Sequence, residues 1–476
     1  MNKYVMGIDN GSQSIKVAIY DMEGNEVAFG SFQLKETLSP EPGVVIHPDD
    51  DLWDSVYAAM KNCLADFSGN PKEIAGIGLC TIRCCRVLLK EDGNLAYPVI
   101  SWMDSRLARP YEHIDDEVKY VTTTSGYLGF RLTGEFVDTA SNYEVHWPLD
   151  HKTLDWSKDD EDFKANGLKK DMVFELVKPG EKLGILRKEL ISEFGFNSDI
   201  PVVATANDKA VEVLGSGIKD ESTIMISLGT FISAMLLRGK NSENTKNYFS
   251  TLACIPFKYV YETNGIRRGM WTVSWFKKLI GEELVTEARK MGVSEEEFLN
   301  RKAQDVPVGS DGLITILDWL ASPSIPYRKG IMIGFDQRHT KYHIYRSILE
   351  AIAFNVKNNI DDMLDEIDGK LSEIVVLGGG SKSDLMMQII ADLFGKPLHR
   401  REGSSSACLG AAICVCQHLS VYKDFYEAIS KMIKTQKTFI PNKKNNEFYN
   451  RINESVVKNV RIHTDEILKL SYPIFS

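Results

Sequence analysis

The sequence predicts a two-domain α/β protein in which each domain begins with the same kind of hairpin. Its 476 residues suggest two or three domains. Residues 4–21, YVMGIDNGSQSIKVAIYD, are typical of a strand, a tight polar loop and a second strand. Residues 222–239, STIMISLGTFISAMLLRG, repeat that pattern about 220 positions later. The repeat indicates an internal duplication, with two unrelated hairpins as the alternative.

The composition bounds the class of protein. The chain is 43% hydrophobic and 26% charged, as soluble globular proteins are. Its net charge of −10 gives no electrostatic support for a nucleic-acid partner. We expect no membrane span and a cytoplasmic location, because no run of 18 apolar residues and no signal-peptide pattern is present. The eight cysteines lack disulfide or zinc spacing, which favours reduced, buried thiols.

The remaining elements of the first half follow from periodicity. A third strand is expected after the turn at 22–25, and an amphipathic helix over 49–67 has an acidic start. Residues 74–94 predict a strand, a loop and a strand, and residues 98–106 carry a strand into a polar cluster. A helix over 127–136 is expected to stop at Gly134.

The second half predicts longer helices. Residues 201–217 are typical of a strand, a short polar loop and a helix rich in small residues. A long amphipathic helix is expected over 342–367. Residues 372–398 predict a buried strand, three glycines that lead through a Ser/Asp cap into a helix, and that helix. The chain after about residue 418 is charged and mostly helical in pattern.

The loop of the first hairpin has the chemistry of a phosphate site. Gly11, Ser12, Gln13 and Ser14 can present backbone and hydroxyl donors with little steric obstruction. Asp9, at the end of the strand, has the carboxylate that a hydrated Mg²⁺ prefers. The alternative is a polar β-turn capped by the aspartate.

Two further loops strengthen the nucleotide interpretation. Gly229 and Thr230, in the second hairpin, can contact the other side of a phosphate chain. Gly378, Gly379 and Gly380 end a hydrophobic strand, so their backbone can approach a flat ligand closely. Each loop alone is a weak signal with a tight turn as its alternative. The three loops in this order indicate a nucleotide site.

Asp208 lies between the two hairpins, at the end of a strand and the start of a helix. An aspartate there can cap the helix. It can instead accept a proton from a substrate hydroxyl, as the base of a kinase does. The surrounding loops favour the second interpretation.

The whole constellation resembles the FGGY family of carbohydrate kinases. GIDNGSQSIK is similar to the first phosphate motif of the family, with Ser12 in place of threonine, and SLGTF is similar to the second. GGGSKSDLMMQIIAD resembles the adenosine motif, ISWMDSR the Trp-x-Asp-x-Arg segment near the sugar, and NDKA the site of the catalytic aspartate. TIRCCR, with GIRRGMWTVSWFKK, most resembles an enterobacterial-type subgroup of unassigned substrate.

The resemblance implies an α/β fold of two actin-like (ribonuclease-H-like) domains with a catalytic cleft between them. It implies a sugar-binding domain over 1–217 and a nucleotide-binding domain over 218–476. It also implies an ATP- and Mg²⁺-dependent sugar kinase with Asp208 as base and Asp9 at the metal. The expected nucleotide residues are Gly11, Ser12, Gln13, Ser14, Gly229, Thr230, Gly378, Gly379, Gly380, Ser381, Ser383 and Gln388.

The expected sugar-binding residues are Arg83, Trp102, Asp104 and Lys209, and here the sequence departs from known relatives. Xylulokinases carry Gly-Gln-Met-His and glycerol kinases Gln-Arg-Glu where this chain has the run Thr81-Ile82-Arg83-Cys84-Cys85. No carboxylate stands beside Arg83, and Lys209 replaces the usual amide.

These departures leave two hypotheses for the substrate. One is a sugar acid or a strongly polar ketose, because arginine binds carboxylates in bidentate geometry. The other is an ordinary ketose, with Lys209 paired to Asp208 or solvated. Two rival classes of protein are a non-enzymatic actin-like switch and a degenerate kinase that acts as a sensor. Monomer and homodimer are both left open.

Overall fold

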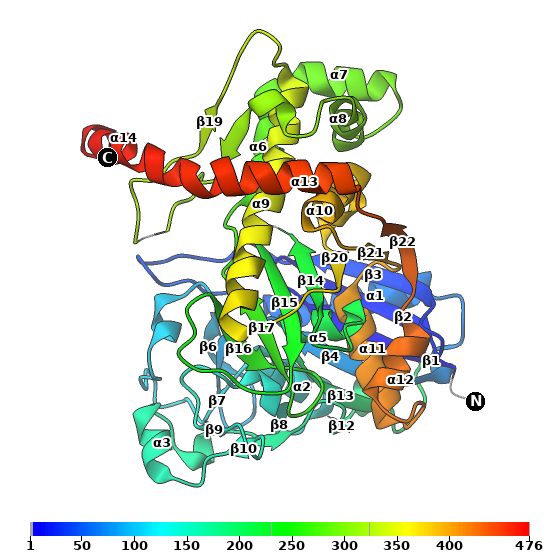
Figure 1. The fold of residues 1–476 in the computed structure, drawn as a ribbon. Coiled ribbons are helices and arrows are strands. Elements are labelled where there is room, and N and C mark those ends of the chain that lie inside the picture. Colours follow the sequence, from blue (N-terminus) through cyan, green and yellow to red (C-terminus); the bar gives the residue numbers. More distant parts are fainter. Residues whose placement is uncertain (1–2, 230, 323, 476) are drawn as a thin grey trace.

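The computed structural model describes residues 3–229, 231–322 and 324–475, and its first half is organised around a mixed sheet of six strands (Figure 1). The strand order is β12-β13-β4-β1-β2-β3. β1 is antiparallel to β2 and parallel to β4, so the predicted first hairpin is confirmed. The strands are β1 (Tyr4–Asn10), β2 (Ser14–Asp21), β3 (Glu26–Gln33), β4 (Ile74–Thr81), β12 (Lys182–Ile185) and β13 (Pro201–Asn207).

A second mixed sheet, of seven strands, repeats this arrangement in the other half of the chain. Its order is β16-β17-β15-β14-β20-β21-β22. β14 is antiparallel to β15 and parallel to β20, as β1 is to β2 and β4, which supports the predicted duplication. The strands are β14 (Thr223–Leu228), β15 (Ile232–Arg238), β16 (Tyr248–Leu252), β17 (Tyr259–Thr263), β20 (Glu373–Leu377), β21 (Leu398–Arg401) and β22 (Thr435–Phe439).

Smaller sheets extend both halves. A three-stranded sheet follows the run Thr81–Cys85, with β5 (Arg86–Leu89) between β6 (Leu95–Ile100) and β7 (Tyr120–Thr122). The two-stranded pairs are β8 (Val137–Thr139) with β11 (Glu175–Val177), β9 (Leu149–Asp150) with β10 (Asp155–Trp156), and β18 (Ile314–Ile316) with β19 (Ile331–Ile333).

Helices cover the sheets. In the first half they are α1 (Asp51–Asp66), α2 (Thr124–Thr133), α3 (Asp160–Ala165), α4 (Lys188–Phe194) and α5 (Asp208–Ser216). The others are α6 (Gly269–Ile280), α7 (Glu282–Lys290), α8 (Glu295–Gln304), α9 (Lys341–Ile367), α10 (Asp384–Phe394), α11 (Ser406–His418), α12 (Phe425–Met432), α13 (Lys443–Ile452) and α14 (Lys458–Phe475). Gly134 ends α2 as predicted, with the positive φ of +86° that glycine tolerates.

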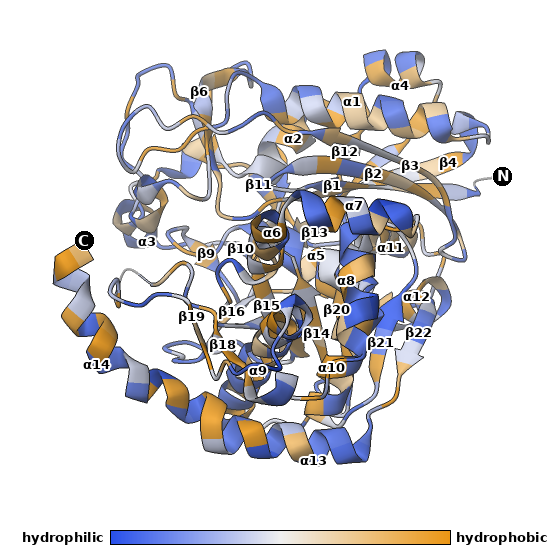
Figure 2. Ribbon diagram, turned by 90° about the horizontal axis from the view of Figure 1, so that it is seen from above, coloured by the Kyte–Doolittle hydropathy of each residue, from blue (hydrophilic) through white to orange (hydrophobic). Residues whose placement is uncertain are grey.

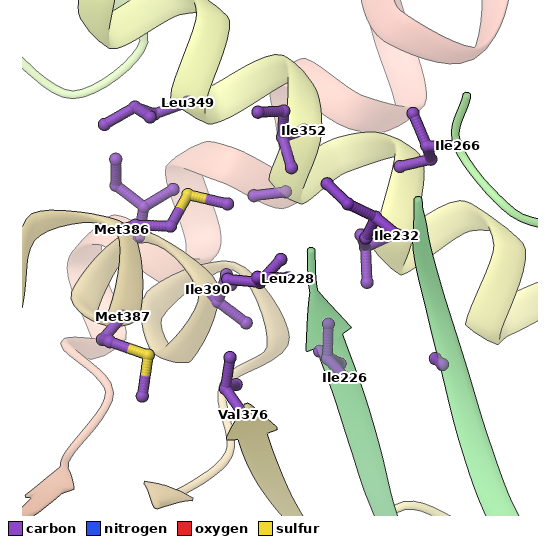
Figure 3. Packing of buried hydrophobic residues seen from close by; sticks show 14 of the residues in the cluster. Ile226, Leu228, Ile232, Ile266, Leu349, Ile352, Val376, Met386, Met387 and Ile390 are labelled. Atoms are coloured by element: carbon purple, nitrogen blue, oxygen red, sulfur yellow. The ribbon is translucent and has the colours of Figure 1, made fainter. Parts of the chain in front are cut away.

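The core of the second half forms where α9 and α10 pack against the sheet. Figure 3 shows Leu349 and Ile352 of α9 and Met386 of α10 close to the strand residues Ile226 and Val376. All five side chains are buried. Each buried aliphatic side chain contributes about 1.5–3 kcal/mol relative to exposure, so this face fixes the position of β14 and the loop that follows it.

A separate core joins the two halves, and α5 and α11 lie in it. α11 comes from the second half of the sequence but packs on β1 and β4 of the first sheet. The contact is backbone to backbone, because a Cβ atom at Gly7 would lie 2.0 Å from the carbonyl oxygen of Cys408. At Gly78 it would lie 2.3 Å from the carbonyl oxygen of Ala411. Only glycine fits at these two positions.

The last helix, α14, lies along the outer edge of the molecule, with hydrophobic residues spread along it (Figure 2). The side chains of Ile467, Leu470 and Ile474 are 70%, 70% and 73% exposed. In the described part of the chain, no helix combines the length and the apolarity that crossing a membrane requires.

Candidate active site

Asp9 stands at the end of β1 and is buried, at 6% exposure. Lys16 Nζ and Ser405 Oγ each lie 3.4 Å from its Oδ2 atom, at the long end for hydrogen bonds. In the described chain no loop amide donates to this carboxylate, so Asp9 does not cap the turn. Burial raises the pKa of Asp9, Lys16 lowers it, and Asp208 and Glu212 raise it further. The carboxylate is therefore close to other acids and only weakly paired.

The loop after Asp9 presents polar groups outward. Ser12 and Gln13 are exposed, and Gly11 and Ser14 are half-buried. Asn10 is completely buried, and its side-chain nitrogen and oxygen both lack a hydrogen-bond partner in the described residues. Unpaired buried amides are rare in folded proteins, which indicates that this strand end is built to contact a ligand or ordered water.

Asp208 is the first residue of α5, at the end of β13. The helix is capped by its neighbour, because Asn207 Oδ1 accepts the amide hydrogen of Ala210 at 3.0 Å. Asp208 is only partly buried, yet its Oδ1 atom is shielded from solvent and has no partner in the described chain. The capping role that the sequence left open for Asp208 is thus filled by Asn207.

Lys209 pairs within its own helix. Its Nζ atom lies 2.9 Å from Oε2 of Glu212, three residues later, and Ser227 Oγ donates to Oε1 of the same glutamate at 3.2 Å. Burial alone would lower the pKa of Lys209, but Glu212 and Asp208 outweigh burial and keep it above the ordinary value. The positive charge is therefore balanced by Glu212, which neither substrate hypothesis anticipated.

Arg83 reaches from the first half to the second. Its Nη2 atom lies 2.6 Å from Oε2 of Glu262 on β17, and Glu262 is fully buried. Ser233 Oγ donates to the other carboxylate oxygen at 2.7 Å, and the guanidinium lies 5.2 Å from the centre of the Phe249 ring. The carboxylate that the sequence lacks beside Arg83 is thus supplied 179 residues later.

In the segment around Trp102, the tryptophan is exposed, whereas Asp104 is occupied by internal hydrogen bonds. Trp102 is 51% exposed. The Asp104 carboxylate accepts hydrogen bonds from Arg106 Nε, Arg106 Nη2 and the amide of Val45, at 2.9, 2.8 and 2.7 Å. Burial would raise the pKa of Asp104, but these bonds lower it below the ordinary value. Asp104 has little capacity left for a sugar, and it holds the loop at Val45 instead.

Two of the three predicted nucleotide loops, that of the second hairpin and the glycine run, meet at the ends of β14 and β20. Gly378 has a φ of +85°, and a Cβ atom there would lie 2.8 Å from the carbonyl carbon of Leu228. Gly378 and Gly379 are exposed, and Gly229 is half-buried. Thr230 lies outside the described residues. α10 starts at Asp384 with Ser383 as its N-cap, which confirms the predicted order of glycines, Ser/Asp cap and helix. The glycines do not open the helix directly, because a 3₁₀ turn over Gly379–Lys382 comes first.

Three residues predicted for the adenosine side make internal hydrogen bonds. Ser381 Oγ donates to the carbonyl of Gly378 at 2.7 Å. Ser383 Oγ caps α10 by accepting the amide hydrogen of Met386 at 3.1 Å. Gln388 Nε2 donates to Asp392 and to the carbonyl of Ile440, at 2.7 and 2.9 Å. These side chains shape the turn and the helix behind it.

The sequence analysis missed four polar residues around Asp9, Lys209 and Arg83: Glu144, Glu212, Glu262 and Ser405. Glu212 has a local signal, since it follows Lys209 at the three-residue spacing of helix neighbours. Glu262 and Ser405 come from distant strands and helices, so no local pattern marks them. In the described residues no three His, Cys, Asp or Glu side chains form a metal cluster. A cation here would have few protein ligands, as Mg²⁺ usually does.

Comparisons with known proteins show the family to which the chain belongs. Models of the FGGY family of carbohydrate kinases match residues 4–122 and 107–215 with the N-terminal domain and residues 225–418 with the C-terminal domain. The chain is 45% identical over 472 residues to the "Uncharacterized sugar kinase YgcE" of Escherichia coli (strain K12), covering 99% of this chain and 96% of that one. A glycerol kinase of Thermococcus gammatolerans is 26% identical over 486 residues, covering 93% and 94%.

Solved structures show the same fold. A gluconate kinase from Lactobacillus acidophilus aligns over 100% of both chains with a TM-score of 0.83 and 21% sequence identity. The two-domain α/β architecture predicted from the sequence is therefore confirmed.

Proposed function

Because the chain belongs to the FGGY family of carbohydrate kinases, which transfer a phosphoryl group from ATP to an alcohol group of a sugar, we propose that Asp208 is the general base of this reaction. The observation that carries the proposal is the unpartnered, solvent-shielded Oδ1 atom of Asp208. This atom is free to accept the proton of a substrate hydroxyl. Asn207 caps the helix, so Asp208 has no structural duty there.

Asp9 fits the Mg²⁺ site of the proposed reaction. Its buried carboxylate makes only the two 3.4 Å contacts described above, and other carboxylates lie near it. Bound Mg²⁺ would neutralise the charge of the ATP phosphates. The loop residues Gly11, Ser12, Gln13 and Ser14, together with Gly229 and Thr230, would hold those phosphates, because the transfer depends mainly on positioning and charge stabilisation.

The proposed adenosine site is the backbone of Gly378, Gly379 and Gly380, of which the first two are exposed and the third is buried. Ser381, Ser383 and Gln388 would hold the turn and α10 in place. The proposed sugar side consists of Trp102, Arg83 and Lys209, with Asp104 as a positioning residue. This assignment places the sugar on residues 1–217 and the nucleotide on residues 218–476.

The test is ADP release from ATP, measured with a panel of ketoses, polyols and aldonates. We expect sugar-dependent release by the wild type, and a loss of roughly 10²- to 10⁴-fold in turnover for Asp208→Asn with ATP binding unchanged. Asp199→Asn, an exposed aspartate before the other end of β13, is the matched control and should keep full activity. Full turnover by Asp208→Asn would show that Asp208 is not the base. ATP binding without any sugar-dependent release would instead favour the sensor.

We also infer that the chain forms a homodimer through α14. Apolar and aromatic positions recur at alternating steps of three and four residues along one stripe: Val460, His463, Ile467, Leu470 and Ile474. Val460 is already buried within the molecule, so the exposed part of the stripe, from His463 to Ile474, would form the seam. This spacing is that of a coiled-coil seam, which is self-complementary. The positions that flank the seam are Asn459, Thr464, Glu466, Ser471 and Pro473. With one charge among them, two copies can approach despite a net charge of −10 on each chain.

Light scattering after size-exclusion chromatography tests the dimer. We expect a dimer for the wild type and a monomer for the double variant Ile467→Glu/Leu470→Glu. Ile462→Glu is the control, because Ile462 is equally exposed, at 69%, but lies beside the stripe. A monomeric wild type, or a dimer that survives the double variant, would contradict the inference.

A further inference from the structure

Arg86 is a buried arginine that makes no hydrogen bond or ion pair through its side chain in the described part of the chain. It is 5% exposed and begins β5, three residues after Arg83. Its Nε atom is buried without a partner. A buried charge normally needs a partner, because removing it from water costs several kcal/mol. The absence of hydrogen-bond and ion-pair partners for the Arg86 side chain therefore requires an explanation.

A second buried arginine shows how this protein pairs such a group when the role is structural. Arg346 is 6% exposed, and its guanidinium donates to Glu350 Oε1 at 2.9 Å, to the carbonyl of Ala303 at 3.2 Å and to Tyr449 Oη at 3.3 Å. Arg86 has equal burial and none of these acceptors. The contrast indicates that the acceptor for Arg86 is not part of the folded chain.

The surroundings of Arg86 hold the guanidinium in place without neutralising it. Its central carbon lies 5.7 Å from the ring centre of Tyr111 and 5.8 Å from that of Trp147, distances at which cations interact with aromatic rings. Asp104 is close enough to act on Arg86 electrostatically, but it is already bonded to Arg106 and Val45. Burial and the charge of Arg106 lower the pKa of Arg86 to about 10, so the group still carries its charge at neutral pH.

The location of Arg86 ties it to the proposed sugar site. It follows the run from Thr81 to Cys85, and its partner across the sheet is Ile100, two residues before Trp102. Arg83 and Lys209 are balanced by Glu262 and Glu212. Arg83 keeps one unpartnered nitrogen, Nη1, but its charge is balanced by Glu262. Arg86 has no acidic partner within the described residues, so its whole guanidinium can bind an anion.

We propose that Arg86 binds the carboxylate of a sugar-acid substrate. The inference rests on the proposed function and names the substrate class. The carboxylate would accept two parallel N–H bonds from the guanidinium, and the hydroxyl to be phosphorylated would lie at the other end of the substrate, toward Asp208. The charge of Arg86, unbalanced in the free enzyme, would then be neutralised on binding.

Stability of the substrate-free enzyme gives the first test. We expect Arg86→Met to raise the melting temperature by a few degrees, because it removes an unpaired buried charge. Arg346→Met is the matched control and should lower it, because its partners lose their bonds. A clear drop for Arg86→Met would show that Arg86 is a structural residue and would overturn the proposal.

Substrate preference gives the second test. Pairs of an aldonate and its alditol, from three to six carbons, are compared with wild type, Arg86→Lys and Arg86→Gln. We expect the wild type to prefer one aldonate by at least about 100-fold in kcat/KM, and Arg86→Gln to lose that preference mainly through KM. Arg86→Lys should retain part of it. If no aldonate is phosphorylated or raises the wild-type melting temperature, the proposal is wrong.

The two proposals fail in different ways. Turnover of a neutral sugar that is abolished by Asp208→Asn but unchanged in Arg86→Gln would leave the kinase mechanism standing and remove the sugar acid. Turnover of an aldonate that survives Asp208→Asn would instead leave the sugar-acid substrate standing and remove Asp208 as the base.

Discussion

The two halves of the chain start from the same hairpin but use its end differently. Ile8-Asp9-Asn10-Gly11-Ser12 in the first half corresponds to Ile226-Ser227-Leu228-Gly229-Thr230 in the second. The first has a buried acid and an unpartnered amide where the second has a hydroxyl and a leucine. The backbone that can contact phosphates is thus duplicated, whereas the charged groups that can do chemistry belong to one copy. The two hairpins share their strand pairing and differ in the side chains at the end of the first strand, as a duplication followed by divergence would leave them.

The central helices show a second asymmetry between the halves. Gly7 in β1 allows the backbone of α11 to approach, whereas the corresponding residue of the second hairpin is Met225, which fills the same core with a side chain. The first sheet is therefore fixed closely to α11, and the second meets the shared core through flexible side chains. We therefore expect the second sheet to shift more easily than the first sheet relative to α11.

The largest expected difference between the two hairpin ends is in their effect on catalysis. Asp9→Ala should lower sugar-dependent ADP release by roughly 10³-fold and weaken its dependence on Mg²⁺, if the carboxylate binds the metal as proposed. The corresponding change in the other hairpin, Ser227→Ala, should cost less than about tenfold, since it removes one hydrogen bond. Kinetics over a Mg²⁺ titration measure both. Equal effects of the two variants would mean that the hairpin ends are not functionally distinct.

Next in size is the ion pair between the halves. Glu262→Gln should lower the free energy of unfolding by about 3 kcal/mol, because Arg83 keeps its charge and loses its buried partner. Urea denaturation measures the loss. The double variant Arg83→Met/Glu262→Gln should recover most of it. A double variant as unstable as the single one would show that Glu262 acts through Ser233 and not through Arg83.

A smaller loss is expected at the contact of the first sheet with α11. Gly7→Ala should destabilise the protein by about 1–3 kcal/mol, because its methyl group overlaps the carbonyl of Cys408 and the helix must shift. Gly239→Ala is the control, since a Cβ atom there meets only side-chain tips at 3.5 Å or more. Urea midpoints that agree for the two variants would argue against a close backbone contact.

The smallest effect concerns Glu144, whose carboxylate accepts the amide hydrogen of Leu252 on β16 at 2.7 Å. Burial raises its pKa to about 7, above the value of 4.5 for an exposed glutamate. Folding therefore favours the protonated form, and stability is lost as the pH rises from about 4.5 through 7. Glu144→Gln cannot ionise, so between pH 5 and pH 8 its stability relative to wild type should rise by about 1–2 kcal/mol. A relative stability independent of pH would contradict this.

The fold was predictable because its signals are local. The hairpins at Asp9 and Ser227, the stop of α2 at Gly134 and the long helix α9 each follow from periodicity or turn chemistry within a short window. The glycine run was correctly predicted between β20 and α10, and Ser383 belongs to the predicted Ser/Asp cap of that helix. The 3₁₀ turn over Gly379–Lys382 was not predicted, because small residues fit a tight turn and the approach to a helix equally well.

The pairing of charges was less predictable, because it depends on which strands become neighbours. Arg83 and Glu262 are far apart in sequence and meet only when the halves assemble. The substrate hypothesis based on Arg83 and Lys209 counted cations without their partners. Asp104 was assigned to the sugar from a motif, although Arg106 within the same motif already occupies it. Arg86 could be singled out only after every other cation near the loop had been paired.

The placement of α11 has a consequence for how the protein is made. A ribosome delivers the chain from the N-terminus, so the first sheet emerges complete, through β13, about two hundred residues before the helix that covers it. Until residues 406–418 are released, the face of β1 and β4 that contains Gly7 and Gly78 is uncovered and lacks side chains at those positions. A nascent chain stalled near residue 250 should therefore be sensitive to proteases and dependent on chaperones, while release of the final sixty residues should complete both halves together.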